Sequence, residues 1–356
     1  MVEKNQPILT EVISIRPSTT YRKRRDLMLK KFSMQNIIGQ LSEIVRRKCL
    51  VVVYSKGRPC EIRKEKLITF ILIARINRKG YEIMEMESEL YLKRHYDHSA
   101  FQYHYSNLGE NTIYILTELL RDKIYNLINE IYLHIFDSTA LSTSVRAERT
   151  RQGIRKKEKL TDKFHTLLGY DPPFQIVVVE GMLMTDHHTS DGKGGEILLQ
   201  QTKIKGYGFG DSKYGTYDLI QLSEEKNLIP ILKQDKRRVR KTLSAKARHR
   251  KIWNGNPHRM YKDIRGTGEA LYGAATRAGL IHTNSRKDEN RAKDGLLIGL
   301  RQNLLTYLRL KALIGIIRKT PPDQKLFNPT SNISAYDISV LGAGGDANLQ
   351  ALAEKV

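Results

Sequence analysis

Two aspartates that directly follow short apolar runs are the residues of this chain best suited to chemistry. Asp137 follows residues 131–136, and Asp211 follows residues 204–210. Apolar runs of this length predict β-strands, which can hold a carboxylate rigidly in place. Carboxylate oxygens are the ligands that hard divalent cations prefer. The pair therefore indicates a metal site, although either aspartate alone is also typical of a turn or a helix N-cap.

Phosphodiester transfer is the reaction that such a site would serve. Two divalent ions roughly 4 Å apart neutralise charge on the pentavalent phosphate and help to deprotonate the attacking oxygen. Glu269 is the candidate third ligand, because it follows Arg265-Gly-Thr-Gly and begins a stretch with helical spacing. By its local pattern alone, Glu269 is more typical of an ordinary solvent-facing helix residue.

The composition predicts a polyanionic partner. The 356 residues include 61 Lys+Arg and 38 Asp+Glu, so the formal net charge is 61 − 38 = +23. Nucleic acid and an anionic membrane surface both suit this charge, but the basic residues are spread through folded-looking segments. We therefore expect double-stranded DNA as the partner and no membrane association. The most apolar stretch, residues 295–317, carries several polar residues and predicts an amphipathic helix.

Cysteine usage and the N-terminal residues favour a cytoplasmic location. Cys49 and Cys60 form no metal-binding or disulfide pattern, which is typical of a reducing compartment. Residues 1–18 are mixed and polar, without the apolar region of a signal peptide. With DNA as the partner, the expected location is the cytoplasm in association with the nucleoid.

Changes of hydrophobic period divide the chain into three parts. Residues 1–125 have helical spacing and predict an α-helical N-terminal domain for DNA binding or assembly. Residues 126–318 alternate strand-like and helix-like runs, which predicts an α/β domain with a mixed sheet flanked by helices. Residues 319–356 are rich in Gly, Ala, Asn and Ser and predict a weakly ordered tail. The expected strands lie at residues 131–136, 175–179, 204–209 and 228–232, and a long helix is expected at 289–317.

Five short motifs follow one another along this chain. They are Asp137-Ser-Thr, Lys163-Phe-His, Thr185-Asp-His, Gly210-Asp-Ser-Lys-Tyr and Arg265-Gly-Thr-Gly-Glu. In this order they resemble the catalytic domain of DDE-type insertion-sequence transposases, and the resemblance covers about residues 57–312. It implies an RNase H-like fold for the α/β domain.

The resemblance also implies roles for individual residues. Asp137, Asp211 and Glu269 would be the catalytic residues and the ligands of Mg²⁺ or Mn²⁺, with two ions expected. The implied activity is cleavage at the ends of an insertion sequence followed by strand transfer, in a synaptic complex of several copies of the chain. Arg265 would contact a DNA phosphate, and Lys213 could hold another as a point charge.

Two basic stretches are further candidates for contact with DNA. The run between Lys236 and Lys251 contains no acid, and it lies between the second and third predicted ligands. We favour phosphate contact here over a merely solvated face. The predicted contacts of this region are Arg237, Arg238, Arg240, Arg248 and Arg250, with Arg277 further along the chain. Residues 146–159 are interpreted as a mobile loop over the site.

Two other motifs are set aside, and two other functions stay open. Gly206-x-Gly208-x-Gly210 lacks the spacing of a dinucleotide-binding loop. Asp186-His187-His188 lacks a second ligand pair and is interpreted as a strand-to-helix connection. The alternative functions are a catalytically inactive DNA-binding protein derived from a transposase and a structure-selective nuclease with an RNase H-like fold.

Overall fold

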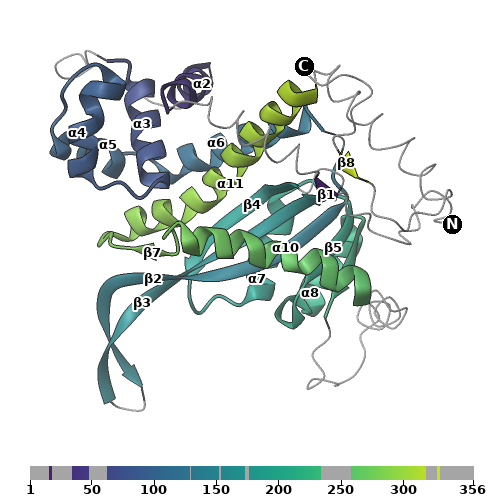
Figure 1. Cartoon of the computed structure of the whole chain (residues 1–356). Helices are drawn as coiled ribbons and strands as arrows, with labels where there is room; N and C mark the ends of the chain where they lie inside the picture. The colour runs from purple at the N-terminus through teal and green to yellow at the C-terminus, as the bar shows by residue number, and fades with distance from the viewer. Residues whose placement is uncertain are drawn as a thin grey trace.

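A mixed β-sheet with helices on both faces forms the centre of the molecule (Figure 1). The computed structural model describes residues 16–17, 34–47, 62–128, 130–151, 154–172, 176–233, 258–317 and 327–328. The expected α/β class with a mixed sheet is confirmed.

The N-terminal part is helical, as its periodicity predicts. Its helices are α2 (Met34–Arg47), α3 (Lys64–Ile76), α4 (Tyr81–Leu92), α5 (His98–Ser106) and α6 (Glu110–Tyr125). Arg78 adopts a left-handed conformation in the turn between α3 and α4, with φ of 61°. Asp97 caps α5, since its side chain accepts a hydrogen bond of 2.7 Å from the backbone N–H of Ser99.

The main sheet has the strand order β4-β3-β2-β5-β6. Its strands are β2 (Leu133–Arg151), β3 (Ile154–Asp171), β4 (Ile176–Asp186), β5 (Gly206–Gly210) and β6 (Leu228–Leu232). Strands β2, β3 and β4 are antiparallel, whereas β5 and β6 run parallel to β2. A short strand, β7 (His282–Thr283), pairs with the outer part of β2. Strands β1 (Arg16–Pro17) and β8 (Phe327–Asn328) form a separate pair.

The sequence interpretation of residues 146–159 as a mobile loop is wrong. Residues 146–151 continue β2 and residues 154–159 begin β3, and the two strands pair antiparallel, with Arg146 opposite Lys159. The hairpin projects from the body of the molecule in Figure 1. Strand β3 was not expected, because its first half carries charged residues where the prediction relied on apolar runs. The ladder of backbone hydrogen bonds between the two strands replaces the missing apolar pattern as the reason for strand structure.

The remaining helices cover the two faces of the sheet. They are α7 (Asp191–Gln201), the short 3-10 helix η1 (Ser212–Tyr214), α8 (Tyr217–Glu225), α10 (His258–Arg277) and α11 (Asp288–Ile317). Side chains alternate along β2, so Ile135 joins the core beneath α10 and α11, and Phe136 joins the core beneath α7 and α8. Asp137 therefore belongs to the face that α10 covers.

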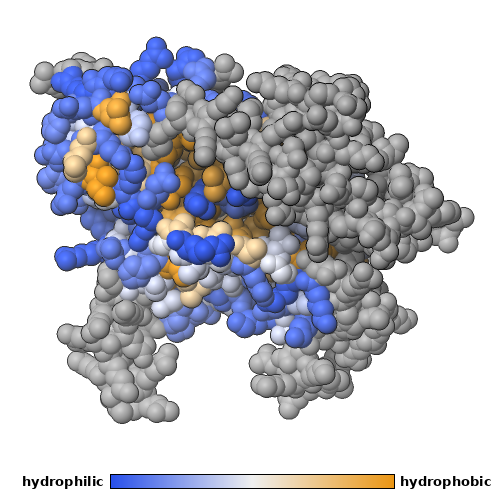
Figure 2. All heavy atoms as spheres, viewed as in Figure 1, coloured by the Kyte–Doolittle hydropathy of each residue, from blue (hydrophilic) through white to orange (hydrophobic). Residues whose placement is uncertain are grey.

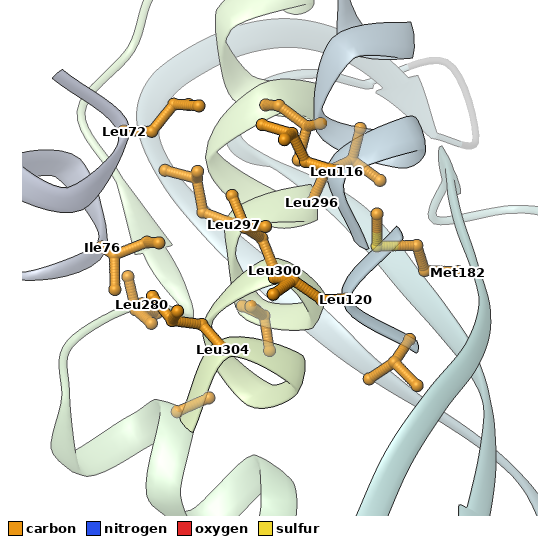
Figure 3. Packing of buried hydrophobic residues seen from close by; sticks show 14 of the residues in the cluster. Leu72, Ile76, Leu116, Leu120, Met182, Leu280, Leu296, Leu297, Leu300 and Leu304 are labelled. Carbon is orange, nitrogen blue, oxygen red and sulfur yellow. The ribbon is translucent and has the colours of Figure 1, made fainter. Parts of the chain in front are cut away.

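Helix α11 ties the helical region to the sheet. Its stripe of buried leucines, which the sequence predicts, packs between α3, α6 and Met182 of β4 (Figure 3). One continuous cluster of buried side chains includes residues of α2 to α6, of α11 and of the sheet. The expected division at residue 125 falls at the end of α6, within this shared packing, and stays a prediction.

Polar side chains of α11 also cover the exposed edge of β4. The amide of Asn303 accepts a hydrogen bond of 2.7 Å from the backbone N–H of Val179 and donates one of 3.0 Å to the carbonyl of the same residue. Gln302 and Thr306 both donate to the carbonyl of Val177, at 2.9 and 2.8 Å. The unpaired backbone groups of an edge strand can pair with a strand of another chain, and these side-chain contacts prevent such pairing at Val177 and Val179.

The visible surface of the helical region is mostly hydrophilic, with separate apolar patches (Figure 2). Ile83, Met86 and Leu90 of α4 are among the exposed large apolar side chains. In the part of the chain that the structure describes, no helix combines the length and the apolar character needed to cross a membrane. The predicted tail lies outside the described residues except for Phe327 and Asn328.

Candidate carboxylate site beneath helix α10

The structure brings Asp137 and Asp211 to the same level of two adjacent parallel strands. Ile135 of β2 pairs with Phe209 of β5, and each aspartate lies two residues further along its own chain. Neighbouring strands are about 4.8 Å apart, so the chain brings both residues to the same end of this pairing, and Asp211 is near enough to raise the pKa of Asp137. Asp137 was expected at the end of its strand, but β2 continues to Arg151. Near Asp137 only the pairing of β2 with β5 ends, because β5 stops at Gly210 and the chain continues into η1.

Helix α10 packs directly over Asp137. A Cβ atom on Gly268 would lie 2.7 Å from Oδ2 of Asp137 and 3.4 Å from Cγ2 of Ile135. Any larger residue at this position would push the helix away from the carboxylate. The glycine therefore permits a close approach that places Arg265 and Glu269, on the same helix, beside the two aspartates.

The environment of Asp137 disfavours its negative charge. Burial raises the pKa of Asp137 to about 6, and the nearby carboxylates of Asp211 and Glu269 act in the same direction. The backbone N–H of Ser138, which donates to Oδ1 at 2.9 Å, and the Arg265 guanidinium oppose this increase only in part. A partly buried carboxylate with a raised pKa is a candidate for a functional site, and a bound cation would stabilise its charge.

Glu269 lies near this pair, but its carboxylate is engaged elsewhere. Its Oε1 is 2.6 Å from Nη1 of Arg265, one helical turn earlier, and its side chain is 61% exposed. The oxygens of Asp137, Asp211 and Glu269 do not form a group within 4.8 Å of one another among the described residues. The assignment of Glu269 as the third ligand stays a prediction, since the carboxylate would have to turn away from Arg265.

Asp211 fits both of the interpretations that its sequence allows. Its side chain caps η1 by accepting a hydrogen bond of 2.8 Å from the backbone N–H of Lys213. The same side chain lies close enough to Asp137 to affect its ionisation. The second oxygen of a capping carboxylate remains available to a ligand, because a single backbone donor occupies the first.

Asp191 is a buried carboxylate that the sequence interpretation missed. It is 4% exposed at the start of α7, where Oδ1 accepts a hydrogen bond from the hydroxyl of Ser138 and lies 2.7 Å from Nζ of Lys163. Nζ of Lys213 lies 3.6 Å from its other oxygen. Burial opposes its ionisation, but Lys163 and Ser138 outweigh burial and lower the pKa of Asp191. Asp191 thus connects β2, β3 and η1 behind the two aspartates.

His165 of the second sequence motif is a packing residue in this structure. Burial is the main reason that its pKa falls to about 4, so its imidazole is neutral at physiological pH. Nε2 lies 2.9 Å from the hydroxyl oxygen of Thr185, and the ring lies against Gly194, where a Cβ would approach Nδ1 to 2.3 Å. Burial and the neutral charge make His165 part of the support behind the site.

Both motifs that were set aside have structural explanations. Asp186 ends β4 and accepts hydrogen bonds from the backbone N–H groups of His188 and Thr189, as expected for a connection between a strand and a helix. Gly206 has φ of 108°, a conformation that favours glycine. A Cβ on Gly208 would lie 2.8 Å from a methyl group of Leu228, so this glycine allows close packing of β5.

Three of the eight predicted DNA contacts lie within the described residues. Arg265 and Lys213 lie at the carboxylate site, and the Lys213 side chain is 70% exposed. Arg277 is exposed in the last turn of α10. The other five predicted contacts, Arg237, Arg238, Arg240, Arg248 and Arg250, lie outside the described residues.

One compact group of possible ligands occurs elsewhere in the described part of the chain. Atoms of Glu85, Asp97 and His98 lie within 4.8 Å of one another. Nδ1 of His98 is 3.0 Å from Oε2 of Glu85, and Asp97 caps α5. These local contacts account for the grouping without a metal ion.

Comparison with known proteins does not assign a family. No protein-family model matches this sequence, and a search of the curated proteins finds no match. The geometry of the carboxylate site and the sequence motifs therefore carry the functional argument.

Proposed function

We propose that this protein is a DDE-type transposase, which cleaves DNA at the ends of an insertion sequence and joins them to a target in a metal-dependent reaction. The observation that supports the proposal is that Asp137, beneath α10, and Asp211 each follow the paired stretch of adjacent parallel strands and lie near enough for Asp211 to raise the pKa of Asp137. Two neighbouring carboxylates at a rigid position of a sheet are suited to divalent ions. The order of the five sequence motifs supports the same assignment.

An RNase H-like fold is part of this proposal. The order of the strands, with three antiparallel strands followed by two parallel ones, is compatible with that fold. Helices on both faces of the sheet are compatible with it as well. The two central parallel strands, β2 and β5, are those that carry the proposed ligands.

The side chains present fit a divalent cation. Asp137 and Asp211 would hold it, and a cation would stabilise the charged form of Asp137, whose pKa burial raises to about 6. Mg²⁺ or Mn²⁺, when bound as a pair, would supply charge neutralisation at the scissile phosphate. Glu269 would join as the third ligand after exchanging its partner Arg265.

The protein's own basic groups would then position the DNA. Arg265, once released from Glu269, can donate to a phosphate oxygen beside Asp137, and the exposed ammonium of Lys213 can attract a second phosphate. Behind them, Asp191 holds Ser138 and Lys163 and so fixes the strand that carries Asp137. A fixed strand is needed because small displacements of catalytic groups lower rates strongly.

The partners follow from the charge and from the proposed reaction. The net charge of +23 favours double-stranded DNA, both as the element ends and as the target. Cutting and joining two ends requires more than one active site, so we propose a homo-oligomer in a synaptic complex. The proposed location is the cytoplasm, at the nucleoid.

The test is nicking of a supercoiled plasmid with Mg²⁺ or Mn²⁺. Asp137→Ala, Asp211→Ala and Glu269→Ala should each abolish nicking while DNA binding, measured by fluorescence anisotropy, is largely retained. Asp186→Ala is the matched control, because Asp186 is an exposed turn aspartate outside the site. Full nicking by the Asp137 or Asp211 variant would refute the proposal, and full nicking by the Glu269 variant would remove that residue from the site.

The ion pair between Arg265 and Glu269 favours a second candidate, a DNA-binding protein that has lost catalysis. A glutamate fixed by its arginine cannot complete a three-carboxylate site. This candidate predicts salt-sensitive binding to duplex DNA and no metal-dependent nicking by the wild-type protein. A structure-selective nuclease would instead cut branched DNA without joining strands, which a strand-transfer assay with labelled ends distinguishes.

A further inference from the structure

A polar cleft lies between the helical N-terminal region and the segment around the start of α11. Its volume is about 480 Å³, within the range of ligand-binding sites. It is lined by Arg75, Tyr81, Gln102, Ser106, Asn284, Ser285, Arg286, Lys287 and Asn290. The lining contains three basic residues and several amides and hydroxyls, but no carboxylate. Such a set of groups suits a ligand that accepts hydrogen bonds and carries negative charge.

The guanidinium of Arg75 is held in place at this cleft. Nη2 of Arg75 lies 2.6 Å from Oδ1 of Asp294, and the guanidinium lies 5.5 Å from the ring centre of Tyr81 and 5.0 Å from that of Tyr105. Its Nε is buried and has no hydrogen-bond partner among the described residues. An arginine that is already ordered loses little further entropy when a ligand binds.

Asp294 does not make the cleft acidic. It is 4% exposed, and its two oxygens accept four hydrogen bonds, from Arg75, Tyr105, Thr283 and Ser285. Arg75 therefore balances the buried charge of Asp294. The positive charge left over belongs to Arg286 and Lys287, which are exposed and form no ion pair within the described ranges.

The cleft is connected to the carboxylate site by one strand. Ser142 of β2 pairs with His282 of β7, and Nε2 of His282 lies 3.0 Å from Oδ1 of Asn284 in the cleft lining. Asp137 precedes Ser142 by 142 − 137 = 5 residues. Five strand residues span about 17 Å, which is roughly five base pairs of duplex DNA. A single duplex is long enough to reach both places.

We propose that this cleft binds the phosphodiester backbone of DNA and forms a second contact surface for the duplex that reaches Asp137. The inference rests on the proposed function for the identity of the nucleic acid. Arg286 and Lys287 supply the charge, and the amides of Gln102, Asn284 and Asn290 donate to phosphate oxygens. The contacts involve backbone phosphates, so binding here is independent of base sequence.

The test compares two double variants that lose the same charge. Arg286→Gln/Lys287→Gln changes the cleft, whereas Lys93→Gln/Lys203→Gln removes two exposed lysines elsewhere. Binding of the full-length protein to a labelled 30-base-pair duplex is measured by anisotropy at several salt concentrations, without divalent ions. The cleft variant should bind about tenfold more weakly at 0.1 M salt, and its salt slope should fall by about 1.8. Equal affinities and slopes of the two variants would overturn the proposal.

A second experiment adds one negative charge, either to the cleft or, as a control, to a position outside it. Gln102→Glu places a carboxylate in the lining and should weaken binding several-fold, whereas Gln201→Glu, at the exposed end of α7, should leave it unchanged. Inorganic phosphate provides the comparison with a free ligand. If it binds the wild-type protein at micromolar concentration and duplex binding is insensitive to Gln102→Glu, the cleft takes a small phosphate compound and the proposal is wrong.

The outcomes separate this inference from the proposed function. Weaker DNA binding by the cleft variants, together with a wild-type protein that does not nick DNA, would support the cleft and refute the transposase. Metal-dependent nicking by the wild-type protein, together with normal binding by the cleft variants, would refute the cleft alone. A wild-type protein that does not bind DNA would refute both.

Discussion

Asp294 is a buried carboxylate and Asp137 is a partly buried one, and the protein treats their charges in opposite ways. Asp294 accepts four hydrogen bonds, one of them from Arg75, and these contacts outweigh burial and lower its pKa. Asp137 accepts one backbone hydrogen bond beside two other acids, and burial raises its pKa to about 6. Through Arg75 and Tyr105, Asp294 connects α11 to the helical N-terminal region. The negative charge of Asp137, in contrast, is only partly stabilised by its neighbours.

The difference offers a criterion for function that does not depend on recognising a family. A carboxylate whose oxygens are saturated by protein donors has no coordination left for a ligand. A carboxylate that is desolvated without enough donors costs stability, and the cost persists only where another benefit offsets it. This criterion agrees with the proposed role of the site beneath α10 and assigns a structural role to the cluster at Asp294.

The largest expected effect is on stability, in Asp294→Ala. Arg75 and three hydroxyl groups would lose their common acceptor in a buried place. Breaking a buried ion pair in this way costs about 3–5 kcal/mol. The free energy of unfolding is measured by urea denaturation, with Asp288→Ala, at an exposed position of the same helix, as the control. A loss of less than about 1 kcal/mol would show that the donors at Asp294 do not stabilise the fold.

Glu180 combines features of both residues. It is buried like Asp294, but like Asp137 it has a raised pKa. Burial raises its pKa to about 7, although the hydroxyl of Tyr125 donates to it. From pH 4.5 to about 7 the native state therefore binds more protons than the unfolded state, so stability falls as pH rises. The total loss is about 3 kcal/mol at pH 8.

Glu180→Gln should remove that part of the pH dependence. The free energy of unfolding would be measured from pH 4.5 to pH 8 for the wild type, for Glu180→Gln and for Glu225→Gln, which changes an exposed glutamate. The wild-type and Glu225→Gln curves should decline together, while the Glu180→Gln curve stays flatter. Three parallel curves would mean that burial does not perturb Glu180.

Asp191 does not belong to the proposed metal site, but its contacts with Ser138 and Lys163 suggest that it positions Asp137. Asp191→Asn should lower kcat for DNA nicking about tenfold and leave KM for DNA nearly unchanged, because Ser138 and Lys163 lose a fixed charge behind Asp137. Asp186→Asn serves as the control, and steady-state nicking rates provide the measurement. An increase in KM alone, or a loss shared by the control, would exclude Asp191 as a positioning residue.

Local sequence patterns predicted much of the secondary structure. Strand β6 and helix α11 were expected from their apolar spacing, and α3 to α6 follow the helical period of the N-terminal part. Strand β3 was missed because Lys156, Lys157 and Lys159 interrupt any apolar pattern. Its structure depends on pairing with β2, a partner that a local pattern cannot identify.

The candidate site also depends on contacts between distant parts of the chain, which local sequence patterns cannot identify. The strand-like runs before Asp137 and Asp211 drew attention to both residues, but only the parallel pairing of β2 with β5 brings the ends of these runs together. Asp191 gave no signal, because its partners Ser138 and Lys163 come from other strands. The pairing of Glu269 with Arg265 follows from their spacing of one helical turn, yet the sequence alone could not decide between that pair and a metal ligand.

The measurement that tests the central claim most directly is binding of Mn²⁺ in the absence of DNA, by isothermal titration calorimetry. The wild-type protein should bind Mn²⁺, and Asp137→Asn and Asp211→Asn should each weaken binding at least tenfold. Glu85→Gln, which alters the other compact group of acids, should bind as the wild type does. Unchanged affinity in Asp137→Asn, or loss of binding only in Glu85→Gln, would contradict the assignment of the metal site to the carboxylates beneath α10.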